Sequence, residues 1–76
     1  MASAFILLNI DVGFDEKIIN SLRKVPEVVE AHNVYGIHDI IVHIKAVSVS
    51  ELKDIIAYKI RRIENITSTL TMIVSE

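Results

Sequence analysis

Val34-Tyr35-Gly36-Ile37-His38-Asp39-Ile40 is the stretch that decides the fold, because it joins two extended segments through a turn near the middle of the chain. The sequence on either side of this turn repeats one pattern. Leu22-Arg23-Lys24-Val25 before the turn is matched by Ile60-Arg61-Arg62-Ile63 after it. Each half is therefore interpreted as a strand, a helix and a strand, and the rules of chain connection leave few ways to arrange two such units.

The composition indicates a small ordered domain, which we expect to span residues 1–76 as a single unit. A domain of this size buries about 60% of the surface of its unfolded chain, and without cysteine neither a disulfide nor a thiolate metal site supplements its core. The net charge of −2, with acids and bases interspersed, offers no basic surface to nucleic acid, so direct DNA binding is not expected. The apolar run at residues 4–8 is too short to span a membrane and lacks the flanks of a secretion signal, which favours a cytoplasmic protein.

Alternating apolar residues predict four strands, at residues 3–12, 27–35, 40–46 and 66–74. The first and third carry the most apolar residues and are expected at the centre of a sheet, with the other two at its edges. The second lacks a strict alternation, which predicts a bulge or an exposed edge. Gly36 supplies the turn between the second and third strands because glycine tolerates a positive φ.

Two helices are predicted between these strands. Phe14, Ile18 and Leu22 recur at helical spacing over residues 14–25, and Pro26 ends that helix. The second helix begins at a capping box of Ser48 and Glu51 and closes at Asn65. Its apolar stripe consists of Leu52, Ile55, Ile56, Ile60 and Ile63. The order of elements predicts a ferredoxin-like α+β fold, a βαββαβ sandwich in which a four-stranded antiparallel sheet has both helices on one face.

The sheet face without helices is expected to be apolar. Its predicted residues are Phe5, Leu7, Ile41 and Ile73, among Asn9, Asp11, His43, Lys45 and the threonines of the last strand. Covering such a face with a standard interface of about 800 Å² per partner gains on the order of 20 kcal/mol before the costs of association. We therefore expect an obligate homo-oligomer that pairs sheet to sheet, in the manner of a dimeric α/β barrel.

The sequence carries no pattern typical of a metal site, a cofactor site or an active site. His32, His38 and His43 do not have the spacing of metal ligands, and no activated nucleophile is present. Asp39 and His43 share a face of the third strand but lie about 13 Å apart, too far for a hydrogen bond. We expect no enzymatic activity. The alternative is a small dimeric α/β-barrel enzyme that uses His32 or His43 in a cavity between the helices and the sheet.

The turn Tyr35-Gly36-Ile37-His38-Asp39 is the candidate binding site, because it combines a glycine, exposed backbone amides and a carboxylate. Amides near Gly36 suit a ligand carboxylate, and Asp39 suits an ammonium group, so the turn has the chemistry to bind a small zwitterion. The alternative is a tight hairpin in which Asp39 only satisfies local amides. The residue types alone favour neither interpretation.

This turn, with Ile60-Arg61-Arg62-Ile63 and Thr67-Ser68-Thr69-Leu70-Thr71, resembles the RAM domain of the leucine-responsive regulator (Lrp/AsnC) family over essentially the whole chain. The resemblance implies an amino-acid-sensing module of transcription regulation. It implies dimers formed through the open sheet faces, often four to an octameric ring, with an amino-acid effector between dimers. It places the ligand-binding residues at Tyr35, Gly36, Ile37, His38 and Asp39, with Thr67, Ser68 and Thr69 of a neighbouring dimer as the opposite wall.

Two features depart from the family pattern. His38 stands where an aromatic residue is frequent, and we expect no helix-turn-helix before residue 1. Any effect on transcription is then expected to pass through a full-length relative. A purely structural assembly partner is the remaining alternative, and it predicts association without ligand dependence. The amino-acid-binding ACT domain shares the strand order, but the turn and Thr67-Ser68-Thr69 favour the RAM resemblance.

Overall fold

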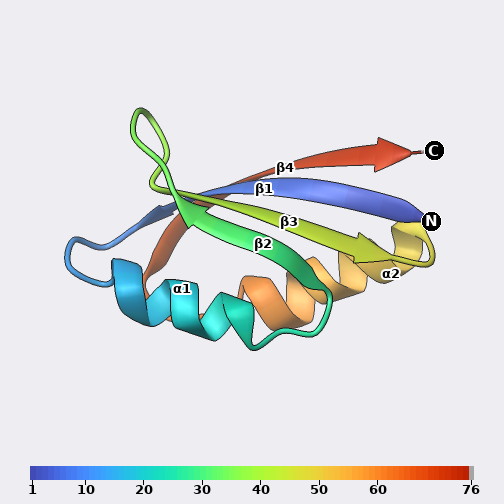
Figure 1. Cartoon of the computed structure of the whole chain (residues 1–76), viewed down its shortest axis with the longest axis horizontal. Helices are drawn as coiled ribbons and strands as arrows, with labels where there is room; N and C mark the ends of the chain where they lie inside the picture. Colours follow the sequence, from blue (N-terminus) through green and yellow to red (C-terminus); the bar gives the residue numbers. More distant parts are fainter. Residues whose placement is uncertain (76) are drawn as a thin grey trace.

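The two strand-helix-strand units predicted from the sequence are both present in the computed structural model, which describes residues 1–75 (Figure 1). The elements are, in order, β1 (Ala2–Ile10), α1 (Asp15–Arg23), β2 (Val28–Asn33), β3 (Ile40–Ala46), α2 (Val49–Ile55), the π-helical segment η1 (Ile56–Ile60) and β4 (Ile66–Ser75). The predicted third strand has the observed bounds. The other elements differ from their expected bounds by a few residues at their ends, where helices and strands fray.

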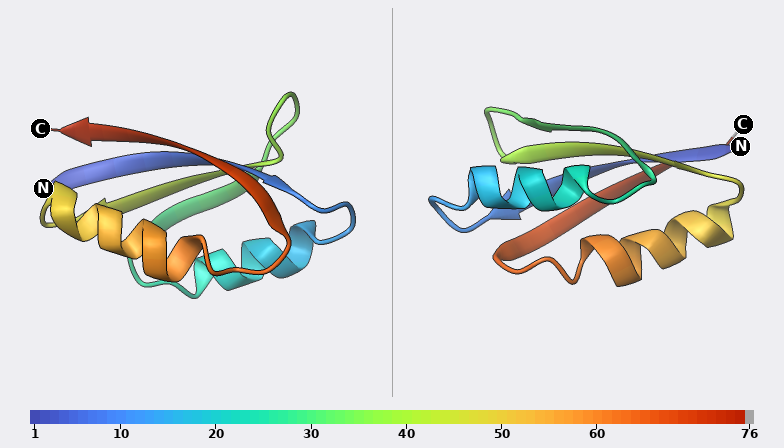
Figure 2. Two further views of the ribbon diagram at one scale, coloured as in Figure 1. Left: turned by 180° about the vertical axis from the view of Figure 1, so that it is seen from behind. Right: turned by 60° about the horizontal axis from the view of Figure 1, so that its bottom comes forward.

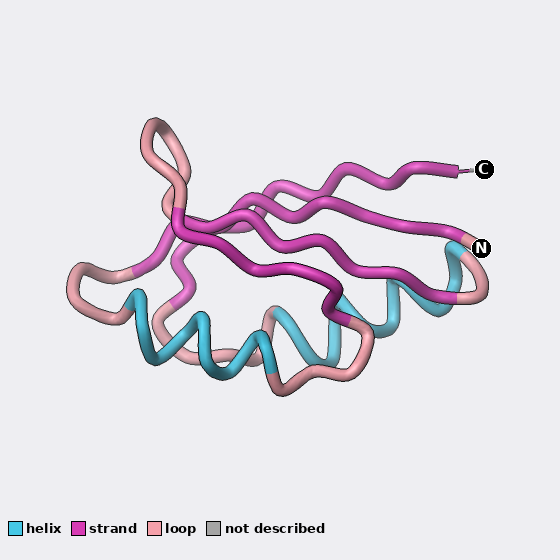
Figure 3. The backbone as a smooth tube through the Cα atoms, viewed as in Figure 1, coloured by secondary structure: helices cyan, strands magenta, loops and turns pink. Residues whose placement is uncertain are grey.

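The strands form one antiparallel sheet in the order β2-β3-β1-β4. Both helices cover the same face of this sheet, and the other face carries no element of the chain (Figure 2, Figure 3). This is the ferredoxin-like α+β fold that the sequence predicts, with β1 and β3 at the centre. The expected irregularity of the second strand is confirmed as a register shift between Val28 and Glu30 where β2 pairs with β3.

The core lies between the sheet and the helices, as the alternation in the central strands requires. Every second residue of β3, and of β1 from Ala2 to Leu8, is buried against the helices, and Ile6, Leu8 and Val42 have no exposed surface. The helices contribute Leu22 and Leu52, which are equally buried. Each such side chain contributes roughly 1.5–3 kcal/mol relative to an exposed one.

The second helix begins as expected but changes its winding. Ser48 caps it, because the Ser48 hydroxyl accepts a hydrogen bond from the Glu51 amide at 3.2 Å. After Ile55 the helix widens into η1, and the amide of Arg61 donates to the carbonyl of Ile56, five residues earlier, at 2.9 Å. The sequence predicted an uninterrupted helix here. Wide π-turns of this kind occur mostly as single turns inside α-helices and often at functional sites.

The predicted faces of the last strand are wrong, because a bulge inverts its alternation. Asn9 of β1 pairs with Ser68, whereas Ile10 pairs with Ile66, so Thr67 is an extra residue on β4. Beyond this bulge Ile73 and the threonines at positions 69 and 71 lie on the helix side of the sheet. Leu70, Met72 and Val74 take their place on the open face, where they are 49%, 45% and 41% exposed.

The open face is nevertheless as apolar as expected. Leu70 pairs with Leu7 and Met72 with Phe5, so two adjacent apolar pairs span the centre of the face. Asp11 does not belong to it, because β1 ends at Ile10 and Asp11 lies in the following turn, where its amide donates to the Asn65 carbonyl at 2.9 Å. Within residues 1–75 no helix has the length and apolar character needed to cross a membrane.

Candidate functional site

The loop between β2 and β3 projects from the end of the sheet, on the side opposite the helices (Figure 1). Its base is closed by the Val34 amide, which donates to the Asp39 carbonyl at 2.9 Å. Gly36 has a φ of +131°, a conformation that side chains with a Cβ rarely adopt, and a Cβ at this position meets no atom within 4 Å. The backbone conformation, rather than space, therefore requires glycine at the tip. Tyr35 and Ile37 beside it are fully exposed.

Asp39 anchors this loop to β1. One carboxylate oxygen, Oδ2, accepts from the Ile10 amide at 2.9 Å, and the Asp39 amide donates to the Leu8 carbonyl at 2.8 Å. These contacts are those of the tight-hairpin alternative, in which Asp39 satisfies backbone amides. The other oxygen, Oδ1, accepts no hydrogen bond within residues 1–75, so half of the carboxylate is left for a ligand.

Asn9 holds the loop from the end of the open face. Its Nδ2 donates to the Ile37 carbonyl at 2.7 Å, and its Oδ1 lies 2.8 Å from His38 Nδ1 and accepts from the Ser68 hydroxyl at 3.0 Å. The sequence places Asn9 on the open face but does not indicate a role at the site. The available signal was that an amide follows Phe5 and Leu7 on that face, at the end of the strand.

These contacts assign the tautomer of His38. The carbonyl of Ile37 requires the Nδ2 of Asn9 on its side, so Oδ1 is the atom that faces His38. An oxygen acceptor needs a donor opposite it, and His38 Nδ1 therefore carries the proton. In the neutral ring Nε2 is then a hydrogen-bond acceptor.

The predicted second part of the site is only partly brought to the loop within one chain. Ser68 reaches it through Asn9, because the bulge at Thr67 turns Ser68 toward the open face. Thr69 pairs with Leu8 on the helix side of the sheet instead. The prediction that Thr67, Ser68 and Thr69 line the opposite wall from a neighbouring dimer concerns an assembly and stays a prediction.

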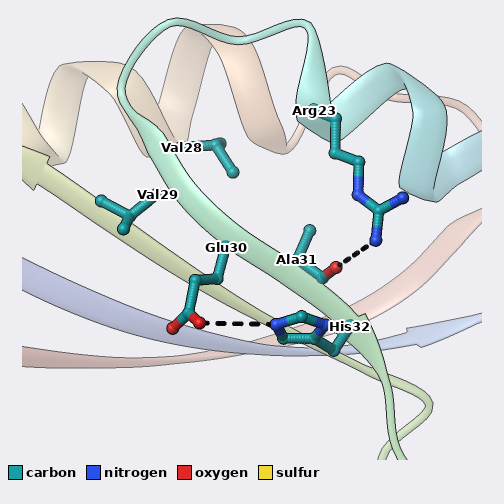
Figure 4. Close-up of a pocket in the computed structure, with 6 residues that line it drawn as sticks. All are labelled: Arg23, Val28, Val29, Glu30, Ala31 and His32. Atoms are coloured by element: carbon teal, nitrogen blue, oxygen red, sulfur yellow. Dashed lines mark hydrogen bonds and ion pairs between the residues drawn. The ribbon is translucent and has the colours of Figure 1, made fainter.

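His32 and His43 lie near the same Glu30 carboxylate, whereas His38 belongs to the β2–β3 loop. His43 stacks on Phe5 of the open face, with ring centroids 4.4 Å apart, and its Nδ1 lies 3.9 Å from the Glu30 carboxylate. The same carboxylate lies 3.6 Å from His32 Nε2 (Figure 4). No cluster of three or more residues suited to a metal ion occurs in the described part of the chain.

His32 borders a hollow of about 280 Å³, but this hollow follows β2 at the edge of the sheet. There the Arg23 guanidinium donates from Nη2 to the Ala31 carbonyl at 3.1 Å, which occupies an outward-facing acceptor of the edge strand (Figure 4). The enzyme alternative requires His32 or His43 in a cavity between the helices and the sheet. His32 is instead at the exposed edge, and His43 is on the open face.

Fold and loop together define a small ferredoxin-like domain with an anchored Gly-x-x-Asp turn. Residues 3–76 match the family model of the Lrp/AsnC ligand-binding domain, and the chain belongs to this family. It is 32% identical over 74 residues to an uncharacterized HTH-type transcriptional regulator of Pyrococcus furiosus, covering 93% of this chain and 49% of that protein. The chain spans about half the length or less of the curated relatives it matches.

Solved structures agree with this assignment. A crystal structure of a hypothetical protein from Pyrococcus horikoshii is 37% identical and superimposes with a TM-score of 0.95, covering 100% of this chain and 92% of that chain. A transcriptional regulator of Neisseria meningitidis, solved as a complex with L-methionine, shares the fold with a TM-score of 0.85 at 19% identity, over 99% of this chain and 50% of its own. The family and the curated relatives are regulators of transcription and not enzymes.

Proposed function

We propose that this chain is an amino-acid-sensing module that binds a free amino acid at the loop of residues 35–39 and couples this binding to its assembly. The observation that carries the proposal is the anchored state of the loop. Asp39 and Asn9 fix it to the end of β1, yet Asp39 Oδ1 and the backbone amides of residues 35–38 have no hydrogen-bond partner among the described residues. A site held in place before its ligand arrives loses less entropy on binding.

The loop offers one set of groups to each end of an amino acid. Asp39 Oδ1 and the acceptor Nε2 of His38 suit the ammonium group, and charge-assisted hydrogen bonds of this kind are the stronger ones. Backbone amides near Gly36 suit the carboxylate, since the glycine lets a ligand approach the backbone closely. Tyr35 and Ile37 contact the side chain of the ligand in this arrangement, and Thr67, Ser68 and Thr69 of a neighbouring dimer complete the site.

The assembly rests on the open sheet face. Phe5, Leu7 and Ile41 of the central strands continue into Leu70 and Met72 of the edge strand β4. An exposed apolar surface of this kind marks a protein interface, and a second copy of the chain covers it sheet to sheet. Further dimers close into a ring of up to four dimers, an octamer, with the loop of residues 35–39 between dimers.

Ligand binding between dimers stabilises the larger assembly by mass action. The amino-acid ligand of the Neisseria meningitidis regulator, which has the same fold, supports this class of effector. The family membership supports a regulatory outcome, in which the module acts in the cytoplasm on transcription through a full-length Lrp/AsnC-type regulator. A purely structural partner would associate with such a regulator equally well with and without the ligand.

Calorimetric titration of the purified chain with each common amino acid, combined with light scattering, tests the proposal. We expect saturable heat from at least one amino acid and a rise in the average mass of the assembly when that amino acid is present. A full set of amino acids that gives neither heat nor a change in mass contradicts the proposal and leaves the structural partner as the better account.

A further inference from the structure

A second hollow, of about 350 Å³, lies between the second helix and the edge strand β4, on the helix-covered side of the sheet. It is lined by Lys53, Ile56, Arg61, Thr71 and Ile73. The loop of residues 34–39 projects from the opposite side of the sheet (Figure 1). The hollow is therefore separate from the loop of the proposed amino-acid site, and of the opposite wall only Thr69 lies on the same face of β4 as Thr71.

The π-turn brings one of the two cations to this hollow. Because the Arg61 amide bonds to the Ile56 carbonyl five residues earlier, Arg61 begins the next turn above Ile56, and both residues line the same hollow. The widened turn leaves Ile60 fully buried in the core. The second helix therefore buries its apolar residues in the core while Arg61 at its end is exposed to solvent.

The bulge in β4 brings a hydroxyl to the same place. Thr71 lies on the helix side only because Thr67 inverts the alternation of the strand. Its Oγ1 is buried and has no hydrogen-bond partner, the sole side-chain atom in this state within the described residues. A buried polar atom without a partner is rare and calls for an explanation. Rotation about χ1 of Thr71 exchanges the positions of the hydroxyl and the methyl group, so the buried hydroxyl can turn toward the hollow that Thr71 lines.

The two cations that line the hollow, Lys53 and Arg61, differ from the neighbouring cations in having no ion pair among the described residues. Lys59 forms an ion pair with Glu27 at 3.0 Å, and the Arg62 guanidinium lies over the Tyr58 ring, 5.2 Å from its centroid. For Lys53 and Arg61 the structure shows no ion pair with any carboxylate of residues 1–75. The floor between them is apolar, formed by Ile56 and Ile73.

We propose that this hollow binds a small carboxylate anion with a short branched apolar tail and no ammonium group. Lys53, Arg61 and the hydroxyl of Thr71 hold the carboxylate, while Ile56 and Ile73 contact the tail. Charge-assisted hydrogen bonds from two cations make the carboxylate the anchor of the ligand. The same cations disfavour a free amino acid, because its ammonium group is brought close to two like charges. The site thus selects against the ligand class proposed for the loop.

The test is titration of the full chain with 3-methylbutanoate as the probe, followed by amide chemical shifts. We expect saturable shifts at Thr71 and Ile73. Arg61→Ala and Thr71→Val should each weaken binding about tenfold, as loss of a charge-assisted or buried hydrogen bond predicts. Arg62→Ala is the matched control, because it removes the same charge one residue away, and its affinity should stay at the wild-type value.

The ligand controls are L-valine, which is 3-methylbutanoate with an ammonium group on the carbon next to the carboxylate, and inorganic phosphate, which carries charge without a tail. Neither compound should change the amide chemical shifts of Thr71 and Ile73 at concentrations at which 3-methylbutanoate saturates the hollow. The proposal is overturned if 3-methylbutanoate leaves these amides unchanged, if phosphate shifts them equally, or if Arg62→Ala weakens binding as much as Arg61→Ala. None of these outcomes bears on amino-acid binding at the loop.

Discussion

Asn9 Oδ1 accepts a hydrogen bond from His38 Nδ1 across 2.8 Å, so the last turn of the β2–β3 loop is tied to the central strand β1. The same amide also holds the Ile37 carbonyl and the Ser68 hydroxyl. A single side chain thereby joins the end of the open sheet face, the candidate site and the start of β4.

Replacing Asn9 should change which ring nitrogen of His38 carries the proton. In Asn9→Ala the acceptor for Nδ1 is lost, and we expect the neutral ring to move toward the Nε2-protonated form that free imidazole side chains favour, with a loss of stability of about 1 kcal/mol. Long-range nitrogen–proton NMR spectra of the ring measure the tautomer directly. Asn20→Ala, at an exposed position of α1, is the control. An unchanged His38 spectrum in Asn9→Ala would show that the amide does not set the tautomer.

A charge on the open face should break the assembly. Met72 pairs with Phe5 at the centre of this face, and Met72→Glu places a carboxylate where a second copy is expected to pack. We expect light scattering to report a monomer at concentrations where the wild type is oligomeric. Val47→Glu adds the same charge at an exposed apolar residue between β3 and α2, and should leave the mass unchanged. Equal masses for Met72→Glu and the wild type are incompatible with sheet-to-sheet pairing.

Alanine substitutions at the two glycines of the chain distinguish the effect of backbone strain from the effect of ligand binding. Gly13 has a φ of +89° and Gly36 a φ of +131°, and neither position has an atom within 4 Å of an added Cβ. Alanine at either site should therefore cost stability through strain alone, on the order of 1–3 kcal/mol. Only Gly36→Ala should also weaken amino-acid binding, as measured by calorimetry under conditions where both variants are folded. Equal affinities in the two variants would argue against a ligand at the loop.

The ion pair between Glu27 and Lys59 should make a small, acid-sensitive contribution to stability. The hydrogen bonds from the Lys59 ammonium lower the pKa of the Glu27 carboxyl in the folded chain, so folding favours the ionised form. The contribution is therefore complete above the pKa of the unfolded carboxyl and is lost as the pH falls through the lower folded value. Both groups are partly exposed, which limits it to about 0.5 kcal/mol.

Lys59→Ala tests this contribution by urea unfolding at neutral pH and in acid. The variant should be less stable than the wild type at neutral pH and equal to it once the carboxyl is protonated in both states. Lys24→Ala, which removes a lysine from the end of α1, should show no such convergence. A difference between Lys59→Ala and the wild type that persists in acid would assign the effect to packing of the lysine stem.

Most of the fold follows from local patterns in the sequence. The alternation in β1 and β3 is unbroken, so their buried faces and central positions could be predicted, and Ser48 acts as the cap that its spacing from Glu51 indicates. Gly36 has the positive φ that the turn requires. These features depend on residues close in sequence, where propensity and periodicity act directly.

The features that were missed depend on partners far along the chain. The bulge at Thr67 arises where β4 pairs with Asn9 and Ile10, and in the stretch after it either alternating set of β4 residues is plausible as the buried one. The wrong assignment of Ile73 follows from that single extra residue. The role of Asn9 was hidden for the same reason, because its three partners lie 28, 29 and 59 positions away.

Calorimetric titration of Asp39→Asn tests most directly whether Asp39 binds the ammonium group of an amino-acid effector. The amide oxygen of this variant can still accept from the Ile10 amide, so the loop keeps its anchor while the charge is removed. Loss of a charge-assisted hydrogen bond should lower the affinity for the amino acid that binds the wild type by roughly 10-fold to 100-fold. Equal affinity in the two proteins, with the fold of the variant unchanged, would contradict the claim.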